Sequence, residues 1–163
     1  MSFGGESHLK RKSSEQVMKI LVPISNFVDR ERLLEALSVF KSIEGFSVTL
    51  FNVIEVSSIT IPLNSEIFER EISETRSKLL PFTNWLESQN FNTKLKVSVS
   101  RSAAEGIIEE ANSGGYSFII MMKRKFRGKF QKLFHKSITE AVIRNTKCMV
   151  LTFLIDPKRT WRL

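Results

Sequence analysis

The sequence predicts an α/β fold in which one parallel sheet carries helices on both faces. Three observations predict it. The 163 residues are the length of one ordinary domain, and 42% of them are apolar, which is enough for a hydrophobic core. Short apolar runs alternate with amphipathic segments to give five strands separated by four helices, an order typical of a parallel sheet. We expect residues 18–155 to form this domain, between a flexible polar tail over residues 1–17 and a short C-terminal tail over residues 156–163.

The first strand and the first helix are predicted at the start of the domain. Residues 18–25 form a short β-branched run, typical of a buried strand, that ends in a turn at Ser25 and Asn26. Asp29 is a favourable cap for a helix that runs to about Ser42, because its carboxylate accepts hydrogen bonds from free backbone N–H groups.

A second strand and a long helix follow. The strand covers residues 46–56, and a loop through Pro62 leads to a helix that begins at Asn64 or Ser65. Apolar residues recur in this helix in steps of three and four, which is the spacing of one helix face. Pro81 lies inside the helix, and we expect it to kink or split the helix because proline lacks the backbone N–H.

The second half of the domain continues the alternation of strands and helices. Its predicted elements are strands over residues 92–100, 116–122 and 148–155, a helix over residues 102–111, and a helix that begins at Ser137. Ser137 and Glu140 have the spacing of a capping box, in which two side chains satisfy N–H groups of the first helical turn. Residues 123–136 are predicted to form a loop.

The composition excludes several classes of protein and site. One cysteine, Cys148, cannot form an internal disulfide, and two histidines, His8 and His135, are too few for a His/Cys zinc cluster. The only aspartates are Asp29 and Asp156, which weighs against a magnesium site for phosphoryl transfer. With no Ser/His/Asp or Cys/His set in view, we expect no enzyme. Apolar runs are far shorter than the ~20 residues that cross a bilayer, and the N-terminus is polar, so we expect a cytoplasmic protein.

Four segments resemble the universal stress protein family. They are KILVPIS (19–25), FSVTLFNVIEV (46–56), AAEGIIEEANSGGYSFIIMM (103–122) and KSITEAVIRNTKCMVLTF (136–153), and they follow the family's order and spacing. The resemblance implies an open five-stranded parallel sheet of the Rossmann-like type found in adenine nucleotide alpha hydrolases, with strand order 3-2-1-4-5. It also implies a ligand site at the switch point, beyond the carboxyl ends of the first and fourth strands.

ATP-binding members of the family have two features that this sequence lacks. The first is an acid at the end of the first strand, where this chain has Ser25. The second is the motif Gly-x2-Gly-x9-Gly-Ser/Thr after the fourth strand. Counted back from Ser137, its glycines become Lys123, Phe126 and Lys136. Counted forward from the strand, the first two become Met122 and Lys125. Because these side chains crowd the close backbone approach that phosphates need, the ATP motif is degenerate.

The resemblance places ten candidate ligand-binding residues around the switch point. They are Ser25, Asn26, Val53, Met122, Lys123, Lys125, Phe126, Lys136, Ser137 and Ile138. ATP or another adenine nucleotide is the cofactor that the family would supply there. The family's loop glycine before the third helix is replaced here by Arg101.

Residues 123–136, the basic segment, concentrate the positive charge of the chain. They carry seven Lys and Arg side chains and no acid, which nearly equals the net charge of +8, and Phe126, Phe130 and Phe134 recur among them. The phenylalanines could complete the core beneath a solvated basic face. The segment could instead bind a phosphate ligand through its side chains, or an anionic membrane or partner surface. We do not expect nucleic acid as a partner, because the sequence shows no nucleic-acid module.

Two functions of different class remain. The first is a non-catalytic, regulatory stress-response domain that does not bind ATP in the usual family way. Because domains of this family resemble the soluble tails of transporters, we expect it to be associated with a membrane transporter. The alternative is a nucleotide-binding protein for ATP, ADP or AMP, in which the Lys/Arg-rich loop replaces the glycine loop and slow ATP hydrolysis stays open. In both cases we expect a homodimer, because the strand from Cys148 to Ile155 lies at a sheet edge in the family order and exposed edges invite pairing.

Overall fold

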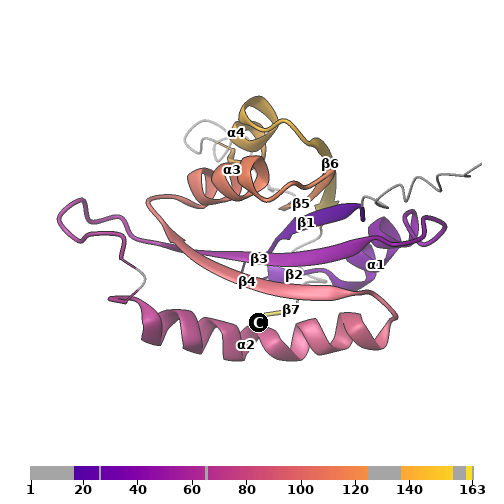
Figure 1. Cartoon of the computed structure of the whole chain (residues 1–163), viewed down its shortest axis with the longest axis horizontal. Helices are drawn as coiled ribbons and strands as arrows, with labels where there is room; N and C mark the ends of the chain where they lie inside the picture. Colours follow the sequence, from indigo (N-terminus) through magenta and orange to yellow (C-terminus); the bar gives the residue numbers. More distant parts are fainter. Residues whose placement is uncertain (1–16, 26, 65, 125–136, 156–160, 163) are drawn as a thin grey trace, which may run out of the picture.

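Five parallel strands form the centre of the fold, in the order β4-β3-β1-β5-β6 (Figure 1). The structure, a computed structural model, describes residues 17–25, 27–64, 66–124, 137–155 and 161–162. The strands are β1 (Lys19–Pro23), β3 (Ser47–Glu55), β4 (Thr93–Ser100), β5 (Phe118–Arg124) and β6 (Met149–Ile155). Counted along these five strands the order is 3-2-1-4-5, so the predicted α/β class and topology are confirmed.

Among the described residues, two helices cover each face of the sheet (Figure 1). They are α1 (Arg30–Ser38) and α2 (Glu69–Ser88) on one face, and α3 (Ala103–Ser113) and α4 (Ile138–Asn145) on the other. Successive strand residues point to opposite faces, so β1 serves two cores: Ile20 packs with α1 and α2, and Leu21 packs with α3 and α4. In the part of the chain that the structure describes, no helix is long and apolar enough to cross a membrane.

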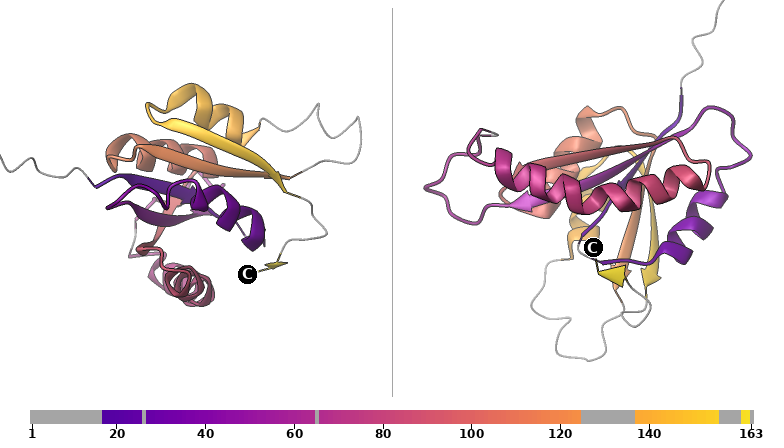
Figure 2. Two further views of the ribbon diagram at one scale, coloured as in Figure 1. Left: turned by 90° about the vertical axis from the view of Figure 1, so that its right-hand side faces the viewer. Right: turned by 90° about the horizontal axis from the view of Figure 1, so that it is seen from below.

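A second, two-stranded sheet lies beside the main one. Strand β2 (Phe27–Val28) follows β1 in the chain and pairs antiparallel with β7 (Trp161–Arg162). Figure 2 shows β7 next to the segment that leads into α1. Residues 156–163 were expected to be a tail, but two of them form this strand. Two residues are too few to show the alternating pattern that predicts a strand from sequence. Such a short strand is defined only by its pairing with β2.

Helix α1 ends at Ser38, before the predicted Ser42. The chain then tightens into turns, in which Phe40 N–H donates to the Leu37 carbonyl at 3.0 Å, a bond across three residues rather than four. Gly45 closes these turns with a φ of +77°, a left-handed conformation that glycine adopts without steric cost.

Helix α2 begins at Glu69, later than the predicted Asn64 or Ser65. The Asn64 side chain accepts the N–H of Glu66 at 3.0 Å, so it closes a separate turn instead of capping the helix. Pro81 does not split α2, which is continuous from Glu69 to Ser88. Proline cannot donate to the Ser77 carbonyl, but both residues are exposed, so water can satisfy that carbonyl.

Strand β5 spans Phe118–Arg124, two residues further along the chain than the predicted 116–122. Its last three residues pair with Phe153, Leu154 and Ile155 of β6. Because β6 continues to Ile155, it supplies ladder partners for residues that the sequence analysis had placed in the following loop.

Candidate functional site

The carboxyl ends of β1 and β5 meet where the chain connections reverse direction, and we call this region the switch point. From β1 the chain continues to β3 on one side, and from β5 it continues to β6 on the other. The ladder between β1 and β5 consists of Ile20 with Phe118 and Leu21 with Ile119, and it stops before the carboxyl end of either strand. Ligands of open α/β sheets bind at such a position.

The end of β1 is fixed to β3. Ile24 N–H donates to the Phe51 carbonyl at 2.8 Å, and Asn52 Nδ2 donates to the Ile24 carbonyl at 2.8 Å. Ser25 lies exposed just beyond this point. Its hydroxyl is neutral, so the end of β1 offers no charged acceptor to a ribose or a base. The candidate residue Asn26 lies outside the described residues.

Further candidate residues lie where β5 ends and α4 begins. Met122 and Lys123 belong to β5 and are partly buried, and Ile138, the first residue of α4, is 43% exposed. Three other candidates lie outside the described residues, together with most of the basic segment: Lys125, Phe126 and Lys136.

Ser137 caps α4, as the sequence predicted. Its Oγ accepts the N–H of Glu140 at 3.4 Å. The second half of the predicted capping box, in which Glu140 turns back to the Ser137 N–H, is replaced by an ion pair. The Glu140 carboxylate pairs with Arg144, one turn further along the helix, at 2.8 Å. Ser137 thus remains the one residue of the degenerate motif with the chemistry that the motif requires.

Val53 lies beneath α3. A Cβ built on Gly106 would lie 2.9 Å from each Val53 methyl carbon and 3.1 Å from the Ser100 Cβ, so strand and helix are in close contact there. Glycine at position 106 permits this approach because it has no side chain. The Val53 side chain is therefore occupied by packing against α3.

A family model described as the universal stress protein family matches residues 16–153 of the chain. The chain belongs to the universal stress protein family. Solved structures have the same fold. The hypothetical protein MJ0577 matches with a TM-score of 0.64 and 26% identity, over 85% of this chain and 96% of that chain. UspA from Lactobacillus plantarum matches with a TM-score of 0.63 and 17% identity, over 84% and 97%. A universal stress protein from Archaeoglobus fulgidus in complex with dAMP matches with a TM-score of 0.55 and 16% identity, over 83% and 96%. No curated protein sequence matches.

This universal stress protein departs from the phosphate motif in sequence, and the position of the first motif glycine lies at the end of a strand. The first motif glycine falls at Lys123 or at Met122, depending on the direction of the count. Both residues lie inside β5, where they pair with Leu154 and Phe153 of β6. A strand residue is extended and points its backbone groups toward the neighbouring strands, whereas a phosphate loop points successive N–H groups at the ligand.

The acids next to the switch point cap helices. Asp29 Oδ1 accepts the N–H of Arg32 at 3.1 Å as the predicted cap of α1, and Asp29 is only 3% exposed. At the end of β3, the Glu55 carboxylate accepts the N–H of Ala103 in the first turn of α3. Neither carboxylate replaces the acid that the family carries at the end of the first strand.

Arg101 forms a clamp that the sequence analysis did not predict. Its guanidinium donates to the carbonyls of Ser58 and Ile61, the latter at 2.9 Å. The clamp ties the loop after β3 to the end of β4, although the tip of the loop at Ile59 is 88% exposed. The only sequence signal was an arginine at the position of a family glycine.

An ionic network around one buried carboxylate lies near the amino end of β5, away from the switch point. Glu110 on α3, with a side chain 8% exposed, pairs with Lys96 of β4 and accepts the Tyr116 hydroxyl at 2.7 Å. Burial raises the pKa of Tyr116 to about 12, with the Glu110 carboxylate adding to the effect and the Thr49 hydroxyl opposing it. The network fastens α3 to the sheet.

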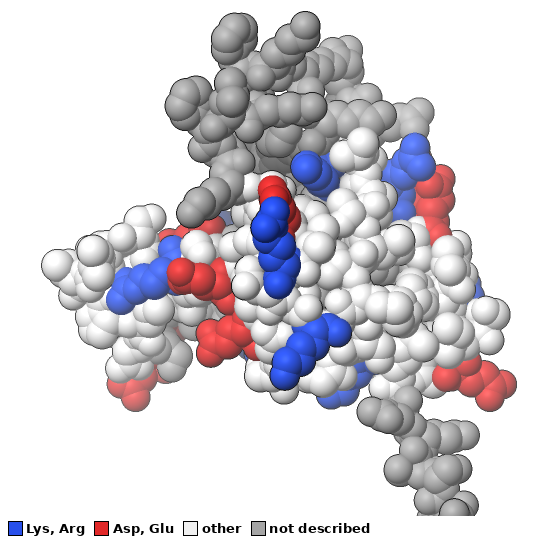
Figure 3. All heavy atoms as spheres, turned by 90° about the horizontal axis from the view of Figure 1, so that it is seen from above, with Lys and Arg blue, Asp and Glu red and all other residues white. Residues whose placement is uncertain are grey.

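The described residues hold no group of three His, Cys, Asp or Glu side chains that could bind a metal ion. Cys148 is partly buried, with its Sγ 3.6 Å from the Ala111 carbonyl. Figure 3 shows the face formed by α3 and α4, where Lys and Arg side chains are interspersed with Asp and Glu. This face therefore presents no single-sign patch among the described residues.

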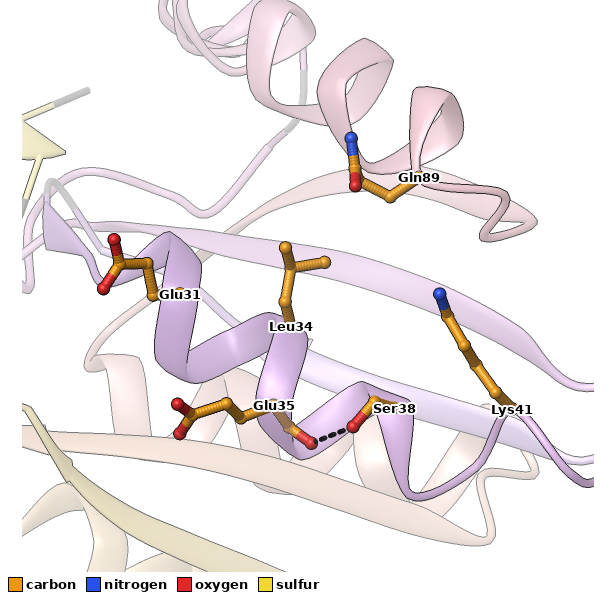
Figure 4. A pocket seen from close by; sticks show the side chains of 6 residues that line it. All are labelled: Glu31, Leu34, Glu35, Ser38, Lys41 and Gln89. Atoms are coloured by element: carbon orange, nitrogen blue, oxygen red, sulfur yellow. Dashed lines mark hydrogen bonds between the residues drawn. The ribbon is translucent and has the colours of Figure 1, made fainter.

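A surface hollow of about 460 Å³ lies between α1 and the end of α2 (Figure 4). Its lining residues are Glu31, Leu34, Glu35, Ser38, Lys41 and Gln89. Glu35 is already paired with Arg32 at 3.1 Å, and the Ser38 hydroxyl donates to the Glu35 carbonyl at 2.7 Å. The hollow runs along α1, and its lining combines acidic and basic side chains with one leucine.

Proposed function

We propose that this chain is a regulatory universal stress protein domain that acts without catalysis and does not hold ATP in the usual way of its family. One observation carries the proposal. The residues in place of the first motif glycine, Met122 or Lys123, lie within a strand that is paired along its length with β6. Their backbone is extended, so their successive N–H groups point to opposite sides of the strand and do not converge as in the loop that cradles phosphates.

The carboxylates around the switch point support the same proposal. Ser25 replaces the family acid, Asp29 caps α1 and Glu55 caps α3. A ribose or adenine would find neutral acceptors at the end of β1. The site therefore loses two kinds of nucleotide contact, one to the phosphates and one to the nucleoside.

A thermal-shift screen of the full chain tests this proposal. The ligands are ATP, ADP, AMP, cyclic AMP and inorganic phosphate, each with and without magnesium. A ligand at 100 times its Kd would stabilise the fold by ~2.7 kcal/mol, which corresponds to roughly 5–10 °C for a domain of this size. We expect no shift that is specific to adenine nucleotides. A shift of that size with ATP alone would overturn the proposal.

Nucleotide binding through cationic side chains is the second candidate. Lys123 lies partly buried at the end of β5 and Ser137 caps the helix that follows, while the relative from Archaeoglobus fulgidus was solved with dAMP. If this function is correct, Lys123→Glu abolishes nucleotide binding by reversing the charge beside the phosphate. The control Lys94→Glu, an exposed position on β4, should leave binding unchanged.

We also propose that the domain is a homodimer that pairs through the edge strand β6. On this strand Met149 is 62% exposed, Leu151 is 40% exposed and Leu154 is 50% exposed. Burying these side chains against a second copy would stabilise a dimer. Light scattering should give a dimer for the parent chain and a monomer for Leu151→Lys. The control Leu80→Lys, on the outer face of α2, should remain dimeric.

We further propose that the basic segment binds an anionic surface on the cytoplasmic side of a membrane, such as the vicinity of a transporter. Seven cations within residues 123–136 supply the attraction, which salt should weaken. The measurement is cosedimentation with phosphatidylcholine vesicles that contain or lack phosphatidylserine, at low and high salt. Equal binding to both vesicles, or none to either, would remove the membrane from the proposal.

A further inference from the structure

The segment between β3 and α2 is apolar, uncharged and exposed, and we call residues 56–64 the apolar loop. Its sequence, VSSITIPLN, contains no Asp, Glu, Lys or Arg. Four aliphatic side chains in or just after the loop are exposed: Ile59 by 88%, Ile61 by 39%, Leu63 by 42% and Ile67 by 53%. Large exposed apolar side chains that lie together mark an interaction surface. We propose that the tip of the apolar loop inserts into the headgroup region of an anionic membrane.

Hydrogen bonds hold the apolar loop in shape and satisfy its backbone. Val56 is buried at the base of the loop, and its N–H donates to the Ser100 carbonyl at 2.9 Å. The Arg101 guanidinium donates to three carbonyls of the loop, those of Val56, Ser58 and Ile61. Moving a backbone carbonyl without a partner from water into lipid is costly. Because Arg101 already satisfies these three carbonyls, the tip can leave water at a lower cost.

The apolar loop projects from the fold and does not line a hollow. Figure 1 and the right-hand view of Figure 2 both show the segment after β3 extending beyond the start of α2. Ile59, at its tip, is the most exposed large apolar side chain among the described residues. A projecting tip of this kind needs a matching pocket in a protein partner, whereas a fluid lipid surface closes around it. The shape therefore favours a membrane over a protein as the partner.

The charges at the same edge of the sheet favour an anionic membrane. Strands β3 and β5 are parallel and only β1 lies between them, so their carboxyl ends lie at one edge of the sheet. Strand β5 ends in Lys123 and Arg124, the first two cations of the basic segment. Cations beside exposed apolar side chains bind anionic membranes by attraction and insertion together. The inference rests on the membrane binding in the proposed function, and it adds the element that enters the lipid.

Acidic side chains at the base of the apolar loop limit how far it enters. Glu66 follows the loop in the sequence, and Glu69 and Glu71 lie in the first turn of α2. An anionic lipid surface repels these carboxylates. We therefore expect insertion to be confined to the tip around Ile59.

A fluorescent label at the tip reports insertion directly. The variant is Ile59→Cys in a Cys148→Ala background of the full chain, labelled with nitrobenzoxadiazole and mixed with phosphatidylcholine vesicles that contain or lack phosphatidylserine. We expect a blue shift and a rise in intensity with the phosphatidylserine vesicles, because the label moves out of water. The control label at Leu80→Cys, a 51% exposed position on α2, should not shift. An unshifted label at position 59 on protein that has bound to the vesicles would overturn the inference.

The variant Ile59→Ser tests the same step without a label. It removes the apolar side chain and adds no charge, and position 59 is so exposed that we expect the melting temperature to stay unchanged. Cosedimentation with phosphatidylserine vesicles should fall by about tenfold or more, because the side chain no longer leaves water. Leu80→Ser should bind as the parent does. High salt should weaken the binding of both Ile59→Ser and the parent while their ratio persists, since salt does not screen the apolar contribution.

Failures of this inference and of the proposed function give different results. If the parent binds phosphatidylserine vesicles and Ile59→Ser binds equally well, the apolar loop does not insert and the inference is wrong, while the proposed membrane binding stands. If the parent binds neither kind of vesicle, both fail. If Ile59→Ser changes the molar mass in light scattering and leaves vesicle binding unchanged, the loop contacts a second copy of the chain and the inference is wrong. The proposal about ATP is tested separately, because none of these measurements uses a nucleotide.

Discussion

Replacing Gly106 by alanine tests how closely α3 lies against β3. The new Cβ would lie 2.9 Å from each methyl carbon of Val53 and 3.1 Å from the Ser100 Cβ, which is inside ordinary van der Waals contact. Val53 is β-branched and stiff, so its methyl groups do not move aside freely. Overpacking of this kind costs about 1–3 kcal/mol.

Helix propensity acts in the opposite direction. Alanine is about 1 kcal/mol more favourable than glycine inside a helix. Gly106→Ala should therefore lower the free energy of unfolding by about 1 kcal/mol net, which lowers the melting temperature by about 2–4 °C. The matched control is Glu109, an exposed position on the same helix, where alanine should be more stable than glycine by about 1 kcal/mol.

Urea unfolding followed by circular dichroism measures these differences. The deciding variant combines Gly106→Ala with Val53→Ala, because the second change removes the two methyl carbons that the new Cβ meets. The double-mutant cycle should show a favourable coupling of about 1 kcal/mol between the two sites. A Gly106→Ala protein more stable than the parent, with no coupling to Val53, would refute the close contact and with it the packing role of Val53.

Three further predictions concern caps, the loop clamp and the partly buried Tyr116. Asp29→Ala should lower the free energy of unfolding by about 1–2 kcal/mol, and Ser137→Ala should lower it by less, because the hydrogen bond that Ser137 accepts is longer. Urea unfolding compares the two variants, and equal losses would contradict the geometry of the caps. Arg101→Ala should speed thermolysin cleavage in residues 56–64, because it frees the carbonyls of the loop, whereas the exposed Arg76→Ala should not. Tyr116, the only tyrosine, has a pKa raised to about 12, so its stabilising neutral form is fully present below its unfolded pKa of about 10 and is lost as the pH rises toward 12. Ultraviolet titration of tyrosinate should follow this range, and Tyr116→Phe should flatten the alkaline loss of stability; a midpoint near 10 in the folded protein would contradict burial.

Features that depend on neighbouring residues in the chain could be predicted from the sequence. Asp29 and Ser137 cap α1 and α4 as expected, because a cap depends on one side chain and the N–H groups three residues away. The alternating strands and helices are also in place, since each periodic apolar run must bury one face. Asn64 shows the limit of this reasoning, because the same side-chain chemistry closes a turn instead of starting α2.

Features that join distant parts of the chain could not be predicted. Arg101 donates to carbonyls 43 and 40 residues away, and β7 pairs with β2 across almost the whole sequence. At the site, Ser25 and Lys123 lie at the ends of β1 and β5, where a switch-point residue belongs. The family resemblance placed Val53 among the candidate ligand-binding residues, whereas the close approach of α3 assigns its side chain to packing.

Calorimetric titration of the full chain with magnesium-ATP tests the central claim most directly, because it reports ATP binding itself without relying on stability. A strand in place of the glycine loop and a serine in place of the acid leave ATP without its main contacts. The account predicts no saturable heat at millimolar ATP. A one-to-one isotherm with a micromolar Kd, lost in Lys123→Glu and retained in Lys94→Glu, would contradict it and establish a nucleotide site built from side chains.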